Sequence, residues 1–453
     1  MAKFKAVILA AGNSTRMKSD VPKFLHEIAG KTLVEHVVDA AQAAGGEVCV
    51  VVGNRAEDVK ETLSGRGVRF FTQTEPLGTG HAVMAAAEFF ADYTGTVIAL
   101  FGADPLITED TISALVELHE KESNAFTVVS AMVGDPLAYG RIVRENGKFS
   151  KIVEHKDATP EQRQIKEINT GVCAFSGAAL NNALSQLSND NSQKEYYLTK
   201  VPEIMMRQGL RGGLMVADSY EEFQGVDTRA DLAAAMKIMR KRINGKHMIN
   251  GVTLIDPDIT YIDCGVQIGQ DTVVWPNTHI QGKTVIGRQC VIKGGRLTDM
   301  TLRDKIEFEN SVAVESEIGS GTRVGPFAYI RPGSRLGENV KVGDFVEIKN
   351  STVGNGSSVA HLAYVGDCDM GEKVNFGCGA ITVNYDGKRK YRTTISDKAF
   401  VGSNSNLVAP VVVGEGAFVA AGSTITDDVP ECTLCIARSR QMVKKDWKDK
   451  RDE

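Results

Sequence analysis

The sequence predicts an α/β protein of two parts, a Rossmann-like domain followed by a left-handed parallel β-helix of hexapeptide repeats. Three observations support this prediction. Short apolar strands alternate with amphipathic helices in the first half, an aliphatic residue recurs at every sixth position in the second, and 453 residues exceed one ordinary core. We therefore expect a first domain over 1–228, a linker helix over 229–249 and a repeat domain over 250–453.

The first half has the spacing of a mostly parallel sheet that helices cover on both faces. Strands are expected at 4–9, 47–52, 68–72 and 96–101, and helices at 33–44, 56–63 and 79–90. A further helix over 228–242, with apolar Leu232, Met236 and Met239 and a basic end, suits a connector. Ligands bind at the carboxyl ends of parallel strands, so the loops there form the candidate site.

The second half has a period of six residues, which fits neither a helix nor an alternating strand. It suits a triangular solenoid in which each face is a short strand and the aliphatic residue points inward. The register is lost in a polar stretch between Ile292 and Ile318, and a loop interrupts it between Asn384 and Ile395. The residues in register are Ile262, Ile268, Val274, Ile280, Ile286, Ile292, Ile318, Val324, Ile330, Leu336, Val342, Ile348, Ile395, Val401, Leu407, Val413, Val419 and Ile425.

Composition argues against several classes of protein. With 24% charged residues and a net charge of −5, the chain offers no overall attraction to nucleic acid, and we expect small-molecule partners. No run approaches the roughly 20 apolar residues that span a bilayer, so no membrane role is expected. Of eight cysteines only Cys432 and Cys435 form a C-x-x-C, without the second pair of a zinc site. Reduced thiols in the cytoplasm are therefore expected.

The loop after the first strand has features of a phosphate site. It runs Ala10-Ala11-Gly12-Asn13-Ser14-Thr15-Arg16-Met17, and Pro22-Lys23 follows. Small residues let backbone N–H groups approach a phosphate, and Arg16 and Lys23 would neutralise its charge. Because the run matches neither a Walker motif nor G-x-G-x-x-G, a glycine turn with solvated basic residues is the alternative.

Several motifs together resemble the sugar-nucleotide pyrophosphorylases. They are the run from Val7 to Met17 with Pro22-Lys23, Gln73-x-Glu-x-Leu-Gly-Thr-Gly-His81, Tyr139-Gly140-Arg141-Ile142, Ile152-Val-Glu154-His-Lys-Asp157 and Glu167-Ile-Asn169-Thr-Gly171. With its hexapeptide half, nearly the whole chain resembles the bacterial family of bifunctional N-acetylglucosamine-1-phosphate uridyltransferases and glucosamine-1-phosphate acetyltransferases. The resemblance also implies a homotrimer with sites between subunits.

For the first domain, the resemblance implies a nucleotidyltransferase that joins UTP to a sugar 1-phosphate. Mg²⁺ spreads the charge and pyrophosphate leaves, so positioning and electrostatics do most of the catalysis. The alternative for one implied residue, Glu154, is a solvated carboxylate at a strand end. The implied residues are Leu9, Ala10, Ala11 and Gly12 for the nucleotide, Arg16 and Lys23 for its phosphates, Gln73, Gly78 and Thr79 for the uracil, and Gly140, Glu154 and Asn169 for the sugar.

The first domain departs from the family at its metal site. The family has Gly-Asp-x-Pro-Leu, with the aspartate on the metal, where this chain has Gly102-Ala103-Asp104-Pro105-Leu106. Asp227 replaces a metal-binding asparagine, and Ser14 replaces a glycine. Alanine offers Mg²⁺ no oxygen, and a shift of one residue along a strand moves a side chain to the opposite face. Either Asp104 relaxes into place, or Asp227 holds the ion with phosphates and water, or the uridyltransferase is impaired.

The repeat domain departs less from the family. Acetyl transfer from a thioester to an amine needs a base, because an ammonium has no lone pair, and His361 is the candidate. Taken alone, a histidine in a repeat is more often structural. The resemblance gives Arg331, Lys349, Tyr364 and Asn375 to the amino-sugar phosphate, and Cys378, Asn384, Tyr385, Ser403, Ala421 and Arg438 to acetyl-CoA.

Two further features of this domain have alternative explanations. Cys378 stands where the family usually has a small residue, and it could be a nucleophile. The chemistry needs no covalent intermediate, however, so we expect a packing role for this thiol in the interior. The basic group Lys388, Arg389, Lys390 and Arg392 could meet CoA phosphates, although a solvated loop is favoured.

We therefore expect a cytoplasmic enzyme that acetylates glucosamine 1-phosphate with acetyl-CoA and then transfers UMP from UTP to the product. It would yield UDP-N-acetylglucosamine for envelope synthesis. Two alternatives stay open. One is an acetyltransferase with an impaired first domain, and the other is a non-catalytic scaffold or regulatory subunit, against which the intact residues of the second half argue.

Overall fold

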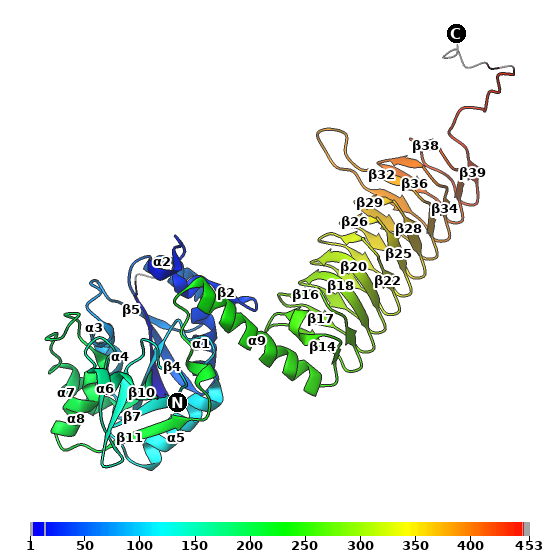
Figure 1. The fold of residues 1–453 in the computed structure, drawn as a ribbon. Helices are drawn as coiled ribbons and strands as arrows, with labels where there is room; N and C mark the ends of the chain where they lie inside the picture. The colour runs from blue at the N-terminus through cyan, green and yellow to red at the C-terminus, as the bar shows by residue number, and fades with distance from the viewer. Residues whose placement is uncertain (1–2, 13–14, 446, 448–453) are drawn as a thin grey trace, which may run out of the picture. The chain divides into compact units, whose positions relative to one another are not determined.

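The computed structural model describes residues 3–12, 15–445 and 447, and the chain divides into two compact units, Met1–Met239 and Arg240–Glu453 (Figure 1). The division falls inside helix α9 (Arg229–Ile249), which extends seven residues beyond the 242 end that its apolar pattern predicts. Among the described residues, no helix is long and apolar enough to cross a membrane.

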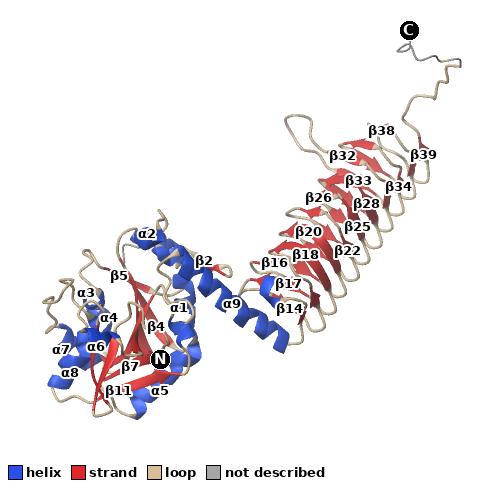
Figure 2. Ribbon diagram, viewed as in Figure 1, coloured by secondary structure: helices blue, strands red, loops and turns tan. Residues whose placement is uncertain are grey.

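The first unit is built on a mixed sheet (Figure 2). Only β10 of the main path runs antiparallel to its neighbours, so the sheet is mostly parallel, as expected. A hairpin of β8 (Arg141–Glu145) and β9 (Lys148–Val153) pairs with β10. The main path is β11 (Gly212–Ala217), β7 (Phe126–Met132), β10 (Glu167–Ser176), β6 (Thr96–Phe101), β1 (Phe4–Ala10), β4 (Gly46–Val52) and β5 (Arg69–Thr72).

Helices cover both faces of this sheet, and a separate apolar core lies under each layer. The helix expected over 79–90 is two helices, because the backbone at Ala86 leaves the helical conformation, and Phe89 and Phe90 of the second are both buried. One face carries α1 (Leu33–Ala43), α2 (Ala56–Thr62) and α5 (Glu109–Lys121); the other carries α3 (Thr79–Ala85), α4 (Ala87–Phe90), α7 (Gly177–Leu184) and α8 (Val201–Arg207). Short elements of this unit are α6 (Pro160–Arg163), β2 (Glu27–Ile28), β3 (Lys31–Thr32), and 3₁₀ turns at Thr15–Met17, Lys23–Leu25, Leu198–Lys200 and Tyr220–Phe223.

The second unit is a parallel solenoid with three faces, which we number in chain order. A full coil advances 18 residues, as from Val273 to Val291. Strands β18 (Val291–Thr298) and β20 (Glu307–Val314) turn the corner from face 1 to face 2, which we call the first corner. The expected repeats are confirmed: every aliphatic residue of the predicted register is buried in one core except Ile268, which is half-buried.

The remaining strands of the solenoid stack in three columns. Face 1 holds β12 (Thr253–Leu254), β15 (Val273–Val274), β22 (Arg323–Val324), β25 (Lys341–Asp344), β28 (Ser358–His361), β31 (Asn375–Phe376), β34 (Phe400–Val401), β37 (Phe418–Val419) and β39 (Leu434–Cys435). Face 2 holds β13 (Tyr261–Ile262), β16 (Thr278–Gln281), β23 (Tyr329–Ile330), β26 (Glu347–Lys349), β29 (Tyr364–Gly366), β32 (Ile381–Val383), β35 (Asn406–Val408) and β38 (Thr424–Ile425). Face 3 holds β14 (Gln267–Ile268), β17 (Val285–Ile286), β19 (Thr301–Leu302), β21 (Glu317–Ile318), β24 (Arg335–Leu336), β27 (Thr352–Val353), β30 (Cys368–Met370), β33 (Thr393–Ile395) and β36 (Val411–Val413).

The six-residue register is lost between Ile292 and Ile318, as expected, but the solenoid is not interrupted there. The coils continue there, and Leu297, Leu302, Phe308 and Ala313 take the inward positions. These coils advance only 16 residues, as from Val291 to Glu307, so the inward residue persists while its spacing in the sequence shortens. The second interruption is a true insertion, and the loop between β32 and β33 projects from the solenoid (Figure 1).

Candidate active sites

The nucleotide loop leaves β1 at the centre of the sheet. Leu9, Ala10 and Ala11 are buried, and Gly102 N–H donates to the Leu9 carbonyl at 3.0 Å, which holds the loop after β6 beside it. A Cβ on Gly53, after β4, would lie 2.5 Å from the Ala11 carbonyl oxygen, so only glycine allows this approach. Residues Asn13 and Ser14 lie outside the described residues.

The two basic residues after this loop both pair with Asp227. Lys23 Nζ donates to Asp227 Oδ1 at 2.7 Å, and Arg16 Nη2 lies 2.9 Å from Asp227 Oδ2. Asp227 thus forms ion pairs with the two cationic side chains that the sequence analysis assigns to the phosphates of the nucleotide. A triphosphate with a divalent cation could take over both pairings, because the cation would compensate Asp227 while the phosphates compensate Arg16 and Lys23.

The sugar residues form a cluster beside β10. A Cβ on Gly140 would lie 3.4 Å from Glu154 Oε2 and 3.6 Å from Asn169 Cβ, and Asn169 N–H donates to the Gly140 carbonyl at 2.9 Å. Burial raises the pKa of Glu154, and a hydrogen bond from Thr199 Oγ1 at 2.9 Å partly offsets this effect. Glu154 is therefore a half-buried carboxylate that accepts a hydrogen bond within the protein, and not a fully solvated one.

The residues predicted for the uracil form a second cluster. One turn joins it to the cluster of residues predicted for the sugar. Gln73 is buried and donates from Nε2 to the Gly78 carbonyl at 3.1 Å. Thr79 Oγ1 accepts from Leu198 N–H at 3.1 Å, and the next residue, Thr199, is the donor to Glu154. The turn at Leu198–Lys200 therefore joins a residue predicted for the uracil, Thr79, to a residue predicted for the sugar, Glu154.

The departures from the family meet at one place. Val226 N–H donates to the Ala103 carbonyl at 2.8 Å, which brings the segment of Asp227 against the loop of Asp104. Ala103 and Asp104 both lie in the loop after β6 and are both buried, and Ala103 packs in the apolar core. Burial raises the pKa of Asp104 to about 7, nearby Lys23 lowers it and Asp227 raises it, so the two carboxylates lie close enough to repel each other.

This pair fits a divalent cation. A cation between them would offset the repulsion between the two carboxylates and would compensate the buried charge of Asp104. Within the described part of the chain, no group of three or more His, Cys, Asp or Glu residues could hold a metal. A two-carboxylate site suits Mg²⁺, which keeps waters and shares substrate phosphates.

In the solenoid, four residues of the second predicted site form a row along the first corner. Gly379 N–H donates to the His361 carbonyl, Asn404 N–H to the Cys378 carbonyl and Gly422 N–H to the Ser403 carbonyl. These bonds stack His361, Cys378, Ser403 and Ala421 on successive coils, and a Cβ on Gly422 would lie 3.7 Å from Arg438 Cδ. After His361 the row carries small side chains, which leaves an extended ledge. The exposed Cys378 lies on it, so the expected packing role for this thiol in the interior is wrong.

The other predicted residues lie mainly on face 2. Arg331 Nη1 donates to Glu347 Oε1 at 2.7 Å, and Lys349 Nζ lies 3.6 Å from Asp367 Oδ2. Asn384 Nδ2 donates to that carboxylate and lies 3.4 Å from Tyr364 Oη. Lys349 and Asn384 therefore contact the buried Asp367, Tyr364 lies against Asn384, and Arg331 pairs separately with Glu347.

Two predicted residues lie apart from this group. Asn375 begins β31 on face 1, across the first corner from Tyr364. Tyr385 is exposed at the base of the projecting loop, where its hydroxyl donates to the Gly387 carbonyl at 2.7 Å. The basic residues 388–390 and 392 of that loop are exposed too, as expected for a solvated loop, and Arg392 pairs with Asp369.

Comparison with known proteins gives the family. The profile of the MobA-like NTP transferase domain matches residues 6–192, and that of the bacterial transferase hexapeptide repeats matches residues 315–350. A bifunctional protein GlmU from Acetivibrio thermocellus is 52% identical, covering 98% of this chain and 96% of its own. Proteins of the same name from Clostridium botulinum (strain Langeland) and Clostridioides difficile are 49% and 48% identical, covering 98% and 99% of this chain and 98% of each relative. The chain belongs to the bifunctional GlmU family.

As a GlmU protein, the chain is an enzyme with acetyltransferase and uridyltransferase functions, and the nucleotide-sugar transfer of this family needs a divalent metal. The alternative of a non-catalytic scaffold is not favoured. Each half of the chain carries one of the two predicted groups of site residues described above.

Several residues that lie beside the predicted site residues were given no role from the sequence. Thr199 and Asp367 each join two predicted groups, and Asp344 contacts His361. Tyr139 and Tyr220, whose hydroxyls lie 2.7 Å apart, stand beside Asp104. For Asp344 and Asp367 the signal in the sequence was an acidic residue near a motif. Acidic residues are too common at protein surfaces for this signal to identify a site residue.

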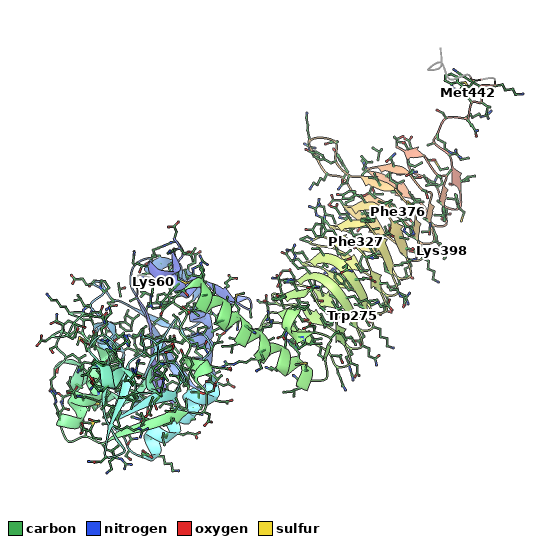
Figure 3. All side chains as sticks on the ribbon, in the orientation of Figure 1. Lys60, Trp275, Phe327, Phe376, Lys398 and Met442 are labelled. Carbon is green, nitrogen blue, oxygen red and sulfur yellow. The ribbon has the colours of Figure 1, made fainter. Side chains whose placement is uncertain are left out.

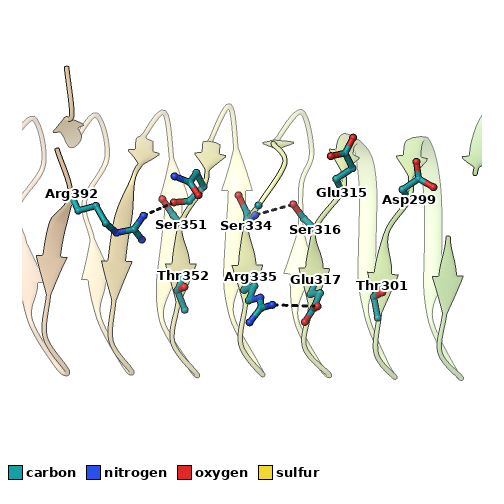
Figure 4. Close-up of a pocket in the computed structure, with 12 residues that line it drawn as sticks. Asp299, Thr301, Glu315, Ser316, Glu317, Ser334, Arg335, Ser351, Thr352 and Arg392 are labelled. Atoms are coloured by element: carbon teal, nitrogen blue, oxygen red, sulfur yellow. Dashed lines mark hydrogen bonds and ion pairs between the residues drawn. The ribbon is translucent and has the colours of Figure 1, made fainter. Parts of the chain in front are cut away.

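A groove of about 620 Å³ on the solenoid lies elsewhere, along face 3 (Figure 4). Its charged groups include Arg335 Nη2, 3.9 Å from Glu317 Oε1, and Arg392, which pairs with Asp369 outside the groove. Ser334 N–H donates to Ser316 Oγ at 3.2 Å. Because these polar groups already have partners within the protein, we do not assign the groove to a substrate.

Proposed function

We propose that this enzyme acetylates glucosamine 1-phosphate with acetyl-CoA in its solenoid and uridylylates the product with UTP and Mg²⁺ in its first unit. The products are UDP-N-acetylglucosamine and pyrophosphate. The observation that carries the proposal is that most residues from distant motifs, matched one by one, lie close to others of the same predicted site in each unit, with the chemistry that each reaction needs.

For acetyl transfer, acetyl-CoA lies along the ledge of Cys378, Ser403 and Ala421, and Arg438 meets its phosphates. Arg331 and Lys349 bind the sugar 1-phosphate, and Tyr364 borders the amino sugar. His361 accepts a proton from the amine as the nitrogen attacks the thioester carbonyl carbon. The C–S bond then breaks, and the departing thiolate takes that proton from the imidazolium.

For uridyl transfer, Gln73, Gly78 and Thr79 hold the base, while Gly140, Glu154 and Asn169 hold the N-acetylglucosamine. The sugar phosphate oxygen is thereby aimed at the α-phosphorus, and effective concentration supplies much of the rate. Arg16 and Lys23 leave Asp227 and bind the triphosphate. Asp104 and Asp227 would hold Mg²⁺, which when bound offsets the charge on the phosphates.

The acetyltransferase works as a homotrimer. Asn375 lies on face 1 and the other amino-sugar residues on face 2, so packing face 1 of one copy against face 2 of another would complete the site. An exposed ridge of Phe327, Phe345 and Leu362 runs along the first corner, with the two phenylalanine rings stacked 5.6 Å apart, and offers apolar surface for this contact. Phe327 of this ridge is labelled in Figure 3. The free thiols and the co-substrates acetyl-CoA and UTP suit the cytoplasm.

The decisive experiment for the first unit is pyrophosphate release from UTP and N-acetylglucosamine 1-phosphate with Mg²⁺. We expect robust release by the natural chain and losses of about 100-fold or more in Asp104→Ala and Asp227→Ala, since removal of an oxygen ligand of the metal removes several kcal/mol of charge stabilisation. Release that appears only in Ala103→Asp would instead mean that the natural chain is an acetyltransferase with a disabled partner domain.

The matching experiment for the solenoid uses His361→Ala. Acetyl transfer should be lost while uridyl transfer keeps its natural rate, because the two sites lie in separate units. Loss of both activities in a folded variant would contradict the two-site assignment, and retained acetyl transfer would remove His361 from the mechanism.

A further inference from the structure

One contact at the first corner goes beyond the motif-based assignment. His361 and Asp344 occupy equivalent positions on adjacent coils, since the pairing of β25 with β28 sets the two residues opposite each other. His361 Nδ1 lies 2.6 Å from Asp344 Oδ1, and Leu362 N–H donates to the Asp344 carbonyl at 3.0 Å. The hydrogen bond from His361 holds the pKa of Asp344 below its usual value.

This contact determines which imidazole nitrogen can act as a base. A neutral imidazole has one N–H donor and one acceptor nitrogen, and a carboxylate partner accepts the proton of the nitrogen that it contacts. With the proton on Nδ1 directed to Asp344, the lone pair stays on Nε2. The carboxylate also favours the imidazolium that forms when Nε2 takes up a proton.

The other charged or titratable groups around His361 are few. On the coil before it, Lys341 attracts the Asp344 carboxylate; on the coil after it, Cys378 stacks next along the corner. Tyr364 lies three residues further along the coil of His361. In the part of the chain that the structure describes, Asp344 is the group that hydrogen-bonds to the imidazole.

We propose that Asp344 is a positioning residue for acetyl transfer, which holds the Nδ1 proton of His361, leaves Nε2 as the base and stabilises the imidazolium. The inference rests on the proposed role of His361. During the reaction the amine proton moves to Nε2 as the N–C bond forms. It then passes from Nε2 to the CoA sulfur as the C–S bond breaks. The Nδ1 proton remains between His361 and Asp344 throughout.

The test compares the dependence of acetyl-transfer kcat/KM on pH in the natural enzyme, Asp344→Asn and Asp344→Glu. Without the carboxylate the His361 imidazolium loses stabilisation. In the pH profile of kcat/KM, the rising limb of the Asp344→Asn variant should therefore move to lower pH. Its kcat should fall about 10- to 100-fold, as expected for a misdirected or weakened general base. The Glu variant keeps the charge and should keep the limb near its natural position, and uridyl transfer should be unchanged in both.

The control is Glu415→Gln, which removes another exposed carboxylate of the solenoid, one that pairs with Lys398 at 2.7 Å. It should leave kcat and the rising limb unchanged. An Asp344→Asn enzyme whose rising limb does not move overturns the inference, whether or not its kcat falls. Acetyl transfer that survives in His361→Ala would instead overturn the proposed base itself, so the two failures are distinguishable.

Discussion

Asp367 links two groups of the proposed acetyltransferase site through its side chain. Its carboxylate is buried at the corner after β29, where it accepts from Asn350 and Asn384 and pairs with Lys349. Burial acts to raise the pKa of Asp367, but the hydrogen bonds from the two asparagines and the charge of Lys349 lower it below its usual value. One ionised carboxylate therefore orients a residue assigned to the sugar phosphate and a residue assigned to acetyl-CoA.

We expect Asp367→Asn to raise the KM of both acetyl-transfer substrates. Charge-assisted hydrogen bonds contribute roughly 1.5–3 kcal/mol, which corresponds to about 10- to 100-fold in binding. Initial-rate kinetics with each substrate varied in turn will measure this. Glu307→Gln, which removes an exposed partner of Arg323, is the control and should change neither KM. A rise in the KM of one substrate alone would contradict the shared role.

At the scale of the element, β10 is held to its neighbours by a charged pair. Glu167 accepts from Arg144 Nε and Nη2 and from Ser130 Oγ, each at 2.7 Å, so β10 is joined to β8 and β7 by side chains as well as by the backbone. Burial pushes the pKa of Glu167 up, yet the hydrogen bonds from Arg144 and Ser130 outweigh it and lower the pKa below its usual value.

We expect Glu167→Gln to lower the free energy of unfolding of the first unit by about 2 kcal/mol at pH 7, less than for a fully buried pair because Arg144 is partly exposed. The folded-state pKa is depressed, so the natural carboxylate stabilises the fold above its unfolded pKa, and this contribution is lost as the pH falls through the folded value. The difference between the variants should thus stay constant from pH 7 to about pH 5 and shrink only below the ordinary glutamate pKa of about 4.3 in urea unfolding. Glu57→Gln, at an exposed pair with Lys60, should cost almost nothing.

The coils of the solenoid depend on the inward aliphatic residue. Ile330 is fully buried and stacks between Ala313 and Ile348 on face 2. We expect Ile330→Ala to cost about 2–5 kcal/mol, because it removes buried methyl groups and leaves a cavity between coils. The thermal transition of the solenoid should fall in temperature, whereas exposed Arg335→Ala should leave it in place. An unchanged transition in Ile330→Ala would mean that the coils do not stack as described.

At the scale of the whole molecule, assembly and acetyl transfer should be coupled. If faces from two copies complete each acetyltransferase site, Phe327→Glu on the exposed ridge should dissociate the assembly by placing a charge in an apolar contact. The mass measured by sedimentation should then fall from three times the chain mass of 48.9 kDa to the mass of one chain. Acetyl transfer should fall with it while uridyl transfer persists, and a fully active monomer would contradict the shared site.

The sequence by itself determined the two-part fold, the six-residue repeat and the chemical types present in each site. These properties depend on local periodicity and on contiguous motifs, which do not need distant parts of the chain to be placed. The departures at Ala103 and Asp227 were also visible in the sequence, although the packing of Ala103 and the approach of Asp104 to Asp227 were not.

Only the tertiary structure decided which residues meet between coils and between loops. Coils advance from 16 residues at Val291 to 25 at Asn375, so a fixed sequence period cannot tell which side chains stack. The contact of Asp344 with His361, the three partners of Asp367 and the bridge through Thr199 all join residues that local spacing leaves apart. Their physical basis is long-range backbone pairing, which sets the position of a side chain only when the whole fold is formed.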